Sequence, residues 1–212
     1  MNGQAAFWDR VADRYAADPI KDPTAYNYTL DRTRTFLGAQ DRVLELGCGT
    51  ASTALLLAPG VGHLTATDFS AAMVSIGRRK VEEAGQANLT VEQGDVEGGP
   101  LPSGPFDAVL AFNLLHLLRD PEKAIGRVRG LLRPGGLFIS KTACLQGRYR
   151  FLALPVGLMR LLGKAPTVSF FSTCWLEDAV RRQGFDILES GYFPKSPPRR
   201  YIVARLKAPG GL

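Results

Sequence analysis

Short apolar runs alternate with stretches of helical length along most of the chain after residue 42. The apolar runs predict strands at residues 42–46, 63–67, 89–93, 106–112 and 137–140. The stretches between them predict helices at residues 52–58, 71–84 and 121–132. Because strands that alternate with helices form βαβ units, we expect an α/β fold with a mostly parallel sheet.

Polar and proline residues mark where these helices begin and end. Ser70 is the expected N-cap of the 71–84 helix, and Gly85 is its expected C-terminal stop. Asp120 and Pro121 stand in the favoured order for the start of the following helix. Three further elements are predicted near the C-terminus: a helix at 173–183 capped by Thr173, and strands at 185–193 and 200–206.

The alternation stops at residues 145–172, which are apolar and basic and are interrupted by prolines and glycines. The chain has a net charge of +6, and no acidic residue stands between Glu122 and Glu177. Such a one-sign field attracts an anionic substrate, a nucleic acid or an anionic membrane, or it is a solvated basic face. We therefore expect 145–172 to be a lid over a lipophilic substrate, a shallow contact with an anionic bilayer, or an ordinary buried cap helix.

The cysteines and the N-terminal residues limit the compartment. The three cysteines, Cys48, Cys144 and Cys174, are odd in number and share no metal-type spacing, so we expect a reducing compartment and no metal site. The first residues do not resemble a signal peptide, and no apolar stretch approaches the ~20 residues of a membrane helix. These features predict a cytoplasmic protein, free or peripheral to the inner membrane face, and leave its oligomeric state open.

A glycine loop, Glu45-Leu46-Gly47-Cys48-Gly49-Thr50, joins the first predicted strand to the first predicted helix. Gly47 and Gly49 permit a tight turn and let a ligand approach the backbone, while the helix N-terminus supplies free N–H groups. Ser52 stands where the dinucleotide fingerprint has its third glycine, so a pyrophosphate ligand is disfavoured. The loop alone is typical of many nucleotide-binding folds.

Two carboxylates sharpen the prediction for this ligand. Asp68 ends the second predicted strand, where a carboxylate can accept hydrogen bonds from both ribose hydroxyls. Asp95 follows the third predicted strand at the same sheet edge and suits an adenine amino group. Together with the glycine loop, these residues predict a ligand that has one nucleoside and no phosphates.

The ordered motifs resemble the class I, seven-strand family of S-adenosyl-L-methionine (SAM)-dependent methyltransferases. The likeness is to its small-molecule branch of ubiquinone- and menaquinone-biosynthesis and phospholipid-headgroup enzymes. The matching segments cover about residues 40–142 in order: Val43–Thr50, Ala66–Ser70, Gly94–Val96, Phe106–Ala111 and Leu131–Leu137. The chain departs from the family at Ala51, where a third loop glycine is common. We expect its methyl group to narrow the turn slightly without blocking the cofactor.

The resemblance implies a Rossmann-like, doubly wound sheet of seven strands, mostly parallel with an antiparallel last strand and with helices on both faces. It implies one methyltransferase domain over residues 1–212. The expected parts are N-terminal cap helices at 1–40, a cofactor-binding core at 41–142, a substrate cap at 143–172, and a C-terminal helix and strand pair at 173–212.

The resemblance also implies roles in binding SAM. Glu45 would order the loop and help to hold the cofactor's ammonium group. The implied positions are Glu45, Gly47, Cys48, Gly49, Thr50 and Asn113 near the methionine part, Asp68 at the ribose, and Phe69, Met73, Asp95 and Val96 around the adenine.

Methyl transfer from a sulfonium needs mainly alignment, and a base only if the acceptor arrives protonated. His116 is the candidate base after the fourth strand, with packing or helix capping as its alternative. Tyr15 belongs to an aromatic stripe that either packs or faces the pocket. Lys141, Thr142 and Cys144 are further candidates to face the substrate. Arg199 and Arg200 would add to the binding of an acidic substrate.

The predicted function is methyl transfer to a small, lipophilic or anionic acceptor such as a quinol, lipid headgroup, phenol or thiol. The alternatives are a nicotinamide-dependent oxidoreductase, disfavoured by the loop and by the lack of a recognisable Tyr/Lys pair, and a SAM-binding module without catalysis. A nucleic-acid acceptor is disfavoured because residues 113–116 are Asn-Leu-Leu-His and not an Asn-Pro-Pro-Tyr-type tetrad. Aromatic residues also do not interleave with the basic ones.

Overall fold

The computed structural model describes residues 3–147, 149, 151, 153–161, 165–194 and 198–208. The helices are α1 (Gly3–Ala17), α2 (Pro23–Arg34), α3 (Ser52–Leu57), α4 (Ala71–Ala84), α5 (Pro121–Leu131), α6 (Ala153–Leu161) and α7 (Thr173–Arg182), with 3-10 turns η1 (Ala58–Gly60) and η2 (Leu115–Leu117). The strands are β1 (Arg42–Leu46), β2 (His63–Asp68), β3 (Leu89–Gln93), β4 (Phe106–Phe112), β5 (Leu132–Ala143), β6 (Phe185–Tyr192) and β7 (Arg199–Leu206).

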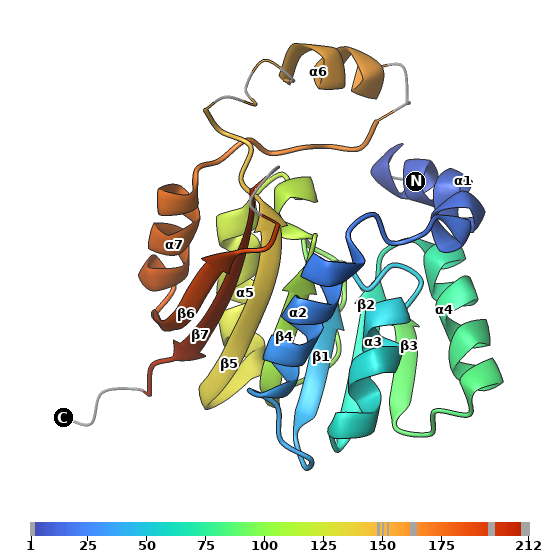
Figure 1. The fold of residues 1–212 in the computed structure, drawn as a ribbon, viewed down its shortest axis with the longest axis vertical. Coiled ribbons are helices and arrows are strands. Elements are labelled where there is room, and N and C mark those ends of the chain that lie inside the picture. The colour runs from blue at the N-terminus through green and yellow to red at the C-terminus, as the bar shows by residue number, and fades with distance from the viewer. Residues whose placement is uncertain are drawn as a thin grey trace.

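The seven strands form one sheet in the order β3-β2-β1-β4-β5-β7-β6 (Figure 1). Strands β1 to β5 pair in parallel, whereas β7 pairs antiparallel with both β5 and β6. The predicted fold class, with its antiparallel last strand, is therefore confirmed.

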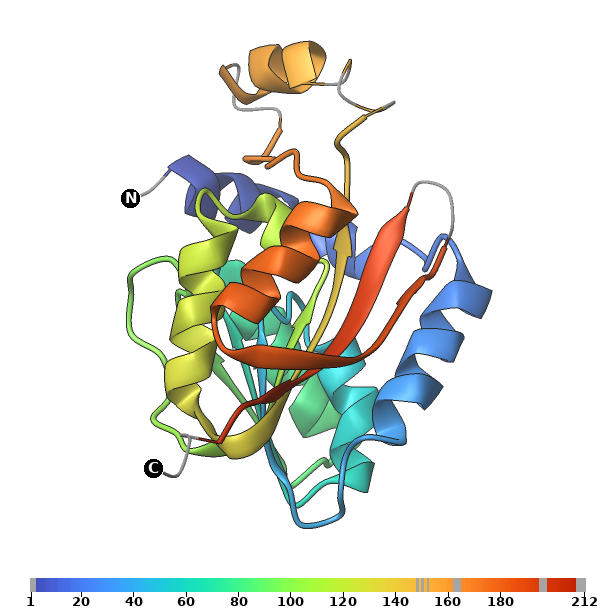
Figure 2. The ribbon, with the colours of Figure 1, turned by 90° about the vertical axis from the view of Figure 1, so that its left-hand side faces the viewer.

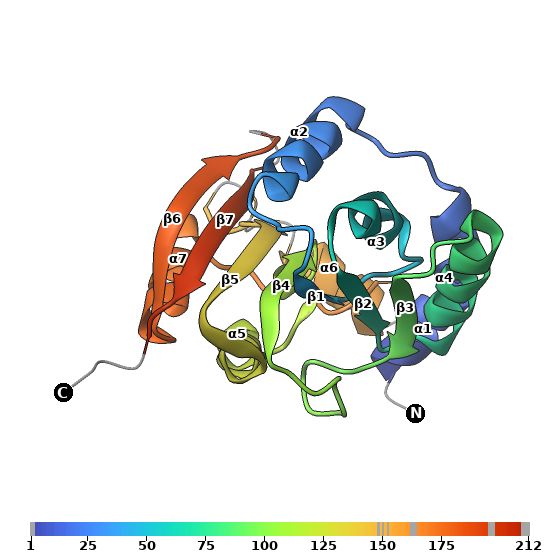
Figure 3. The same ribbon diagram turned by 90° about the horizontal axis from the view of Figure 1, so that it is seen from below.

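Helices cover both faces of the sheet, as Figure 3 shows from below. Neighbouring strand residues point to opposite faces, so Val43 packs with one apolar cluster and Leu44 with the other. The Val43 cluster lies beneath α2, α3 and α4, and the Leu44 cluster lies beneath α5 and α7. Burial on both faces explains why the central strands are continuous apolar runs in the sequence.

Two local predictions need correction. Ser172, not Thr173, caps α7, because its Oγ accepts the Trp175 N–H at 3.0 Å, while the Thr173 hydroxyl accepts a hydrogen bond from Tyr192. Strand β5 begins at Leu132 and not near 137, because Leu132 already pairs with Phe106 ahead of a register shift. Ser70 and Gly85 bound α4 as predicted.

The carboxyl ends of β1 to β5 meet at one edge of the sheet, where ligands of such folds bind. Helix α1 lies over this edge beside α4, and α6 stands beyond it (Figures 1 and 2). The segment that carries α6 leaves and returns there: the Gln146 N–H donates to the Phe171 carbonyl, and the Ser169 N–H donates to the His116 carbonyl. Among the described residues, no helix has both the length and the apolarity needed to cross a bilayer.

The turn after β1 uses left-handed backbone at Gly47 (φ +64°), Gly49 (φ +55°) and Ala51 (φ 58°). A left-handed residue other than glycine costs about 1–2 kcal/mol, which explains why the family favours a third glycine here. The Ala51 methyl group is fully buried and faces Gly77 of α4. It is absent from the pocket wall described below, so it does not obstruct that pocket.

Replacing Gly47 should cost more stability than its backbone angle alone explains. A Cβ there would lie 2.7 Å from Leu114 Cδ1, whereas a Cβ at Gly85, which has a similar φ of +61°, would meet nothing within 4 Å. We expect Gly47→Ala to lower the free energy of unfolding by about 2–4 kcal/mol and Gly85→Ala by about 1–2 kcal/mol. Denaturant unfolding of both variants measures the difference. Equal losses of unfolding free energy would show that the Leu114 side chain moves aside without destabilising the fold.

Candidate active site

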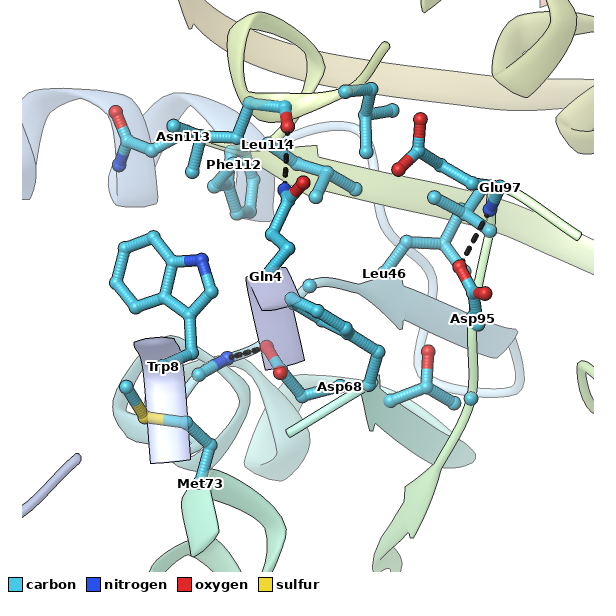
Figure 4. Close-up of a pocket in the computed structure, with 18 of the residues that line it drawn as sticks. Gln4, Trp8, Leu46, Asp68, Met73, Asp95, Glu97, Phe112, Asn113 and Leu114 are labelled. Carbon is cyan, nitrogen blue, oxygen red and sulfur yellow. Dashed lines mark hydrogen bonds between the residues drawn. The ribbon is translucent and has the colours of Figure 1, made fainter. Parts of the chain in front are cut away.

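A pocket opens at the carboxyl edge of the sheet, and its empty volume is about 760 Å³ with some open solvent included. Figure 4 shows the side chains gathered around it from α1, β2, α4 and the segments after β3 and β4. Its wall consists of Gln4, Trp8, Tyr15, Leu46, Gly47, Gly49, Thr67, Asp68, Phe69, Met73, Gly94, Asp95, Val96, Glu97, Phe112, Asn113, Leu114, Leu117 and Leu118.

Asp68 ties the glycine loop to the start of α4. Its Oδ2 accepts the Gly49 N–H and its Oδ1 accepts the Ser70 N–H, both at 2.9 Å. Burial raises the pKa of this carboxyl, and the backbone N–H donors of Ser70 and Gly49 oppose that rise. Because an ionised carboxylate offers about four lone-pair sites, both oxygens keep capacity for hydroxyl donors of a ligand.

Asp95 lies in a loop that is fixed from two sides. Its Oδ1 accepts the Glu97 N–H at 2.8 Å, which closes a tight turn after β3. Arg127 of α5 donates to the carbonyls of Asp95 and Gly99, each at 2.8 Å. The planar guanidinium therefore holds the loop on which Asp95 faces the pocket.

Glu45 lies behind the glycine loop and is 2% exposed. Within the described part of the chain, its Oε2 has no hydrogen-bond partner. Burial and, to a lesser extent, the charge of Asp68 raise the pKa of Glu45 to about 8. A buried carboxyl without a donor is suited to a cationic ligand group, so this orphaned oxygen fits the ammonium of SAM.

Nine of the predicted residues meet at the pocket wall: Tyr15, Gly47, Gly49, Asp68, Phe69, Met73, Asp95, Val96 and Asn113. Glu45, Cys48, Thr50 and His116 are not part of that wall. Cys48 packs in the core and its N–H donates to the Thr67 carbonyl, while the Thr50 hydroxyl accepts from Lys80 Nζ. These two residues therefore shape the loop rather than line the pocket.

Helix α1 contributes more to the pocket than its sequence pattern indicated. Gln4 and Trp8 join Tyr15 on the wall, and the Gln4 side-chain amide donates to the Leu117 carbonyl at 2.9 Å. Asp9 fixes the helix, because its Oδ1 accepts from the Ser70 hydroxyl at 2.6 Å and from the Ala72 N–H. The spacing of Gln4, Trp8 and Tyr15 on one helix face was the signal available in the sequence.

Tyr15 and His116 differ in their relation to the pocket. The Tyr15 ring covers Gly49, with Cε1 3.4 Å from the position of an added Cβ. Burial of its hydroxyl, followed by the charges of Asp68 and Glu45, raises the pKa of Tyr15. His116 shares a 2.9 Å hydrogen bond between Nδ1 and the Thr142 hydroxyl. Burial, and then Arg199, lower the pKa of His116 to about 4, so its ring is neutral at neutral pH.

In the described residues, no three His, Cys, Asp or Glu side chains are grouped so as to hold a metal ion. Asp107 has a structural role at the opposite sheet edge, where it accepts the Arg42 N–H and pairs with Arg133.

Residues 43–136 match the family model described as a methyltransferase domain. A demethylmenaquinone methyltransferase of Listeria welshimeri is 29% identical over 150 residues, which are 66% of this chain and 62% of that relative's length.

Two solved structures share the fold. YcgJ of Bacillus subtilis superposes with a TM-score of 0.70 at 17% identity and covers 87% of this chain and 100% of its own. Magnesium protoporphyrin IX methyltransferase (ChlM) of Synechocystis PCC 6803, with bound SAH, superposes with a TM-score of 0.73 at 16% identity over 96% of this chain and 98% of its own. Residues 43–136 therefore match a methyltransferase domain, and the shared fold and the orphaned Glu45 oxygen agree with SAM as its cofactor.

Proposed function

We propose that the protein transfers a methyl group from SAM to a small, lipophilic acceptor. The observation that carries this proposal is one pocket that has Asp68 and Asp95 on its wall. Behind its glycine loop lies Glu45, whose Oε2 has no hydrogen-bond partner among the described residues. Two relatives are named for small-molecule acceptors, demethylmenaquinone and magnesium protoporphyrin IX. In the proposal, the predicted 1–212 domain acts as one unit, with the core at 41–142 binding the cofactor.

In the proposal, the nucleoside end of SAM lies between the ends of β2 and β3. Asp68 accepts hydrogen bonds from the ribose hydroxyls, because the Gly49 and Ser70 N–H groups already orient both of its oxygens. Phe69 and Met73 contact the adenine, while Asp95 and Val96 hold its edge.

The methionine end then lies against the glycine loop. Gly47 and Gly49 let it approach the backbone, and Asn113 lies at its far side on the pocket wall. Glu45 supplies the anion that faces the ammonium group. Tyr15 covers Gly49 and excludes water from this end.

SAM, when bound, supplies a methyl group that the positive sulfur already activates toward a nucleophile. The chain's residues therefore need mainly to align donor and acceptor and to keep water out. His116 stays the candidate base. Its neutral ring can accept a proton, although the Thr142 hydrogen bond and its place outside the pocket wall suit a positioning role equally well.

Asp68→Asn should weaken SAM binding by roughly 10- to 100-fold, because charge-assisted hydrogen bonds contribute about 1.5–3 kcal/mol each. Calorimetry with SAM, S-adenosylhomocysteine and NADH measures this, and wild type should bind the first two and not NADH. Asp186→Asn is the matched control, since Asp186 is exposed on β6 and pairs with Lys207 at the surface. Unchanged affinity in Asp68→Asn would remove the ribose assignment, and NADH binding would favour an oxidoreductase.

Binding of SAM should release a proton at pH 7 through Glu45. With a pKa of about 8, unliganded Glu45 is mostly protonated at pH 7. A cation placed beside it favours the ionised form and lowers that pKa, so up to about one proton leaves on binding. Calorimetry in buffers of different ionisation enthalpy counts the protons.

Glu45→Gln is the control for this proton count, because it keeps the shape of the side chain and cannot ionise. Its expected release is close to zero. If proton release persists unchanged in Glu45→Gln, the released proton comes from another group, and Glu45 is not the anion that faces the ammonium group of SAM.

We further propose that α6 and its flanks contact an anionic membrane. Phe151, Leu154, Leu158 and Met159 are 71%, 86%, 62% and 46% exposed, so they cover no core in this structure. Residues 145–172 contain four basic residues and no acidic one: Arg148, Arg150, Arg160 and Lys164. An apolar helix surface within a basic segment has the chemistry of an interfacial helix, which lies on a bilayer without crossing it.

Vesicle co-sedimentation tests this contact with the full chain. We expect binding to phosphatidylglycerol vesicles that weakens with salt, and little binding to phosphatidylcholine vesicles. Replacing Leu154 and Leu158 with Gln should reduce binding about tenfold, because each loses transfer of an apolar side chain. Gln at Leu56 and Leu188, which are 46% and 43% exposed elsewhere, is the matched control. Equal binding of both double variants would contradict the α6 contact.

A further inference from the structure

A second, smaller cavity adjoins the pocket at the carboxyl ends of β4 and β5. Its empty volume is about 270 Å³, again with open solvent included. Phe112 and Asn113 line both cavities, so the two meet at these residues. The remaining wall is Tyr26, Thr29, Leu30, Thr53 and Lys141.

The sheet register brings two cations to this place. Lys141 of β5 pairs with Tyr201 of β7, and Ala143 pairs with Arg199. Paired residues, and residues two apart on a strand, point to the same face, so Lys141 and Arg199 are diagonal neighbours on the face covered by α2. Phe112 of β4 pairs with Lys141 from the other side.

Lys141 is a buried cation without an anion. It is 5% exposed, and its Nζ donates to the Thr29 hydroxyl at 3.1 Å. In the described residues it forms no salt bridge. Burial, and then the charge of Arg199, lower the pKa of Lys141 to about 8, with Asp22 at the start of α2 opposing them. Two of its three N–H donors therefore remain for a ligand.

Arg199 also lacks a carboxylate within the described part of the chain. Its Nη1 donates to the amide oxygen of Asn113 at 3.2 Å, and this amide is neutral. The next residue, Arg200, points to the opposite face of the sheet and forms a salt bridge with Glu177. Arg199 and Arg200 therefore differ in that Arg200 has a carboxylate partner. A desolvated charge such as that of Lys141 destabilises a fold unless something compensates it.

We propose that Lys141 and Arg199 bind the acceptor as an oxyanion, so that the acceptor is a molecule with an acidic hydroxyl group, a phenol or an enol. This inference rests on the proposed methyl transfer. Lys141 lines the second cavity, and Arg199 donates to Asn113, which lines both cavities, so an anion bound by the two cations would lie at the reacting end of the acceptor. The aromatic rings of Tyr26 and Phe112 line the cavity and suit a flat apolar body.

The step balances without a protein base. The acceptor hydroxyl loses its proton to water before or during binding, because the two cations stabilise the anion. The oxyanion's electron pair, on oxygen or on its conjugated carbon, forms the bond to the methyl carbon. The bond between that carbon and sulfur breaks, and its electrons stay on sulfur as a neutral thioether. When carbon is methylated, its proton then leaves to water.

A coloured phenol tests the pair directly. We would titrate the full protein, saturated with S-adenosylhomocysteine, with 4-nitrophenol and follow phenolate absorbance against pH. The apparent pKa of the bound phenol should fall by about one unit or more, a tenfold preference for the anion. 4-Nitroanisole, which has a similar shape and no charge, should bind at least about tenfold more weakly than the phenolate.

Variants then assign this preference to the two residues. Lys141→Met and Arg199→Met should each weaken phenolate binding about tenfold, while Arg205→Met, an exposed arginine on the same strand, should not. Neither residue pairs with a carboxylate among the described residues, so removing its charge is not expected to unfold the protein. An unshifted phenol pKa, no phenolate binding, or equal binding in all three variants would overturn the inference. Calorimetry with SAM separates this outcome from failure of the proposed function, since these variants should still bind SAM.

Discussion

The hydrogen bond from the Gly49 amide to the Asp68 carboxylate is the contact on which the site depends. It joins the turn after β1 to the turn after β2, two segments that the parallel sheet brings to the same edge. The second oxygen of Asp68 holds the Ser70 amide, and the Ser70 hydroxyl donates to Asp9 of α1. One buried carboxylate thus fixes the glycine loop, the start of α4 and the helix above the pocket. An apolar residue there would leave both of these amides without their acceptor.

The same edge holds several ionisable groups whose burial is not matched by partners. Among the residues that the structure describes, Glu45 Oε2 has no hydrogen-bond partner, and Lys141 donates to the Thr29 hydroxyl but forms no salt bridge. Their pKa values move in opposite directions, upward for Glu45 and downward for Lys141, as burial predicts for an acid and a base. Glu45 therefore favours folding at low pH and loses that advantage as the pH rises from 4.5 through about 8. Burying Glu45 and Lys141 in this way costs stability, and such a cost is typical of binding sites where a ligand supplies the opposite charge.

Much of the fold, and many of the residues that gather on the pocket wall around Asp68, could be predicted from the sequence. The central strands can be recognised in the sequence because burial on both faces makes them continuous apolar runs. Asp68 can be recognised as a site residue because it ends one of these strands. The neighbouring sequence does not decide whether Ser172 or Thr173 caps α7. The Thr173 hydroxyl accepts a hydrogen bond from Tyr192 of β6, which lies 19 residues further along the chain. Gln4 reaches the pocket only because its amide meets the Leu117 carbonyl, 113 residues away. The pairing of Lys141 with Arg199 depends on the antiparallel register of β5 and β7, which a sequence pattern does not specify.

The two proposals about the acceptor constrain each other. An oxyanion at Lys141 and Arg199 requires an acidic hydroxyl, whereas the exposed leucines of α6 favour an apolar body delivered from a bilayer. Both features stand at the carboxyl edge of one sheet, because the segment carrying α6 is anchored to the His116 carbonyl after β4. A molecule with an apolar body and one ionisable hydroxyl meets both requirements, while a hydrophilic anion meets only the first and a neutral lipid only the second. The proposed acceptor class therefore follows from two separate surfaces and not from the pocket proposed to bind the cofactor, because the fold alone does not specify a substrate.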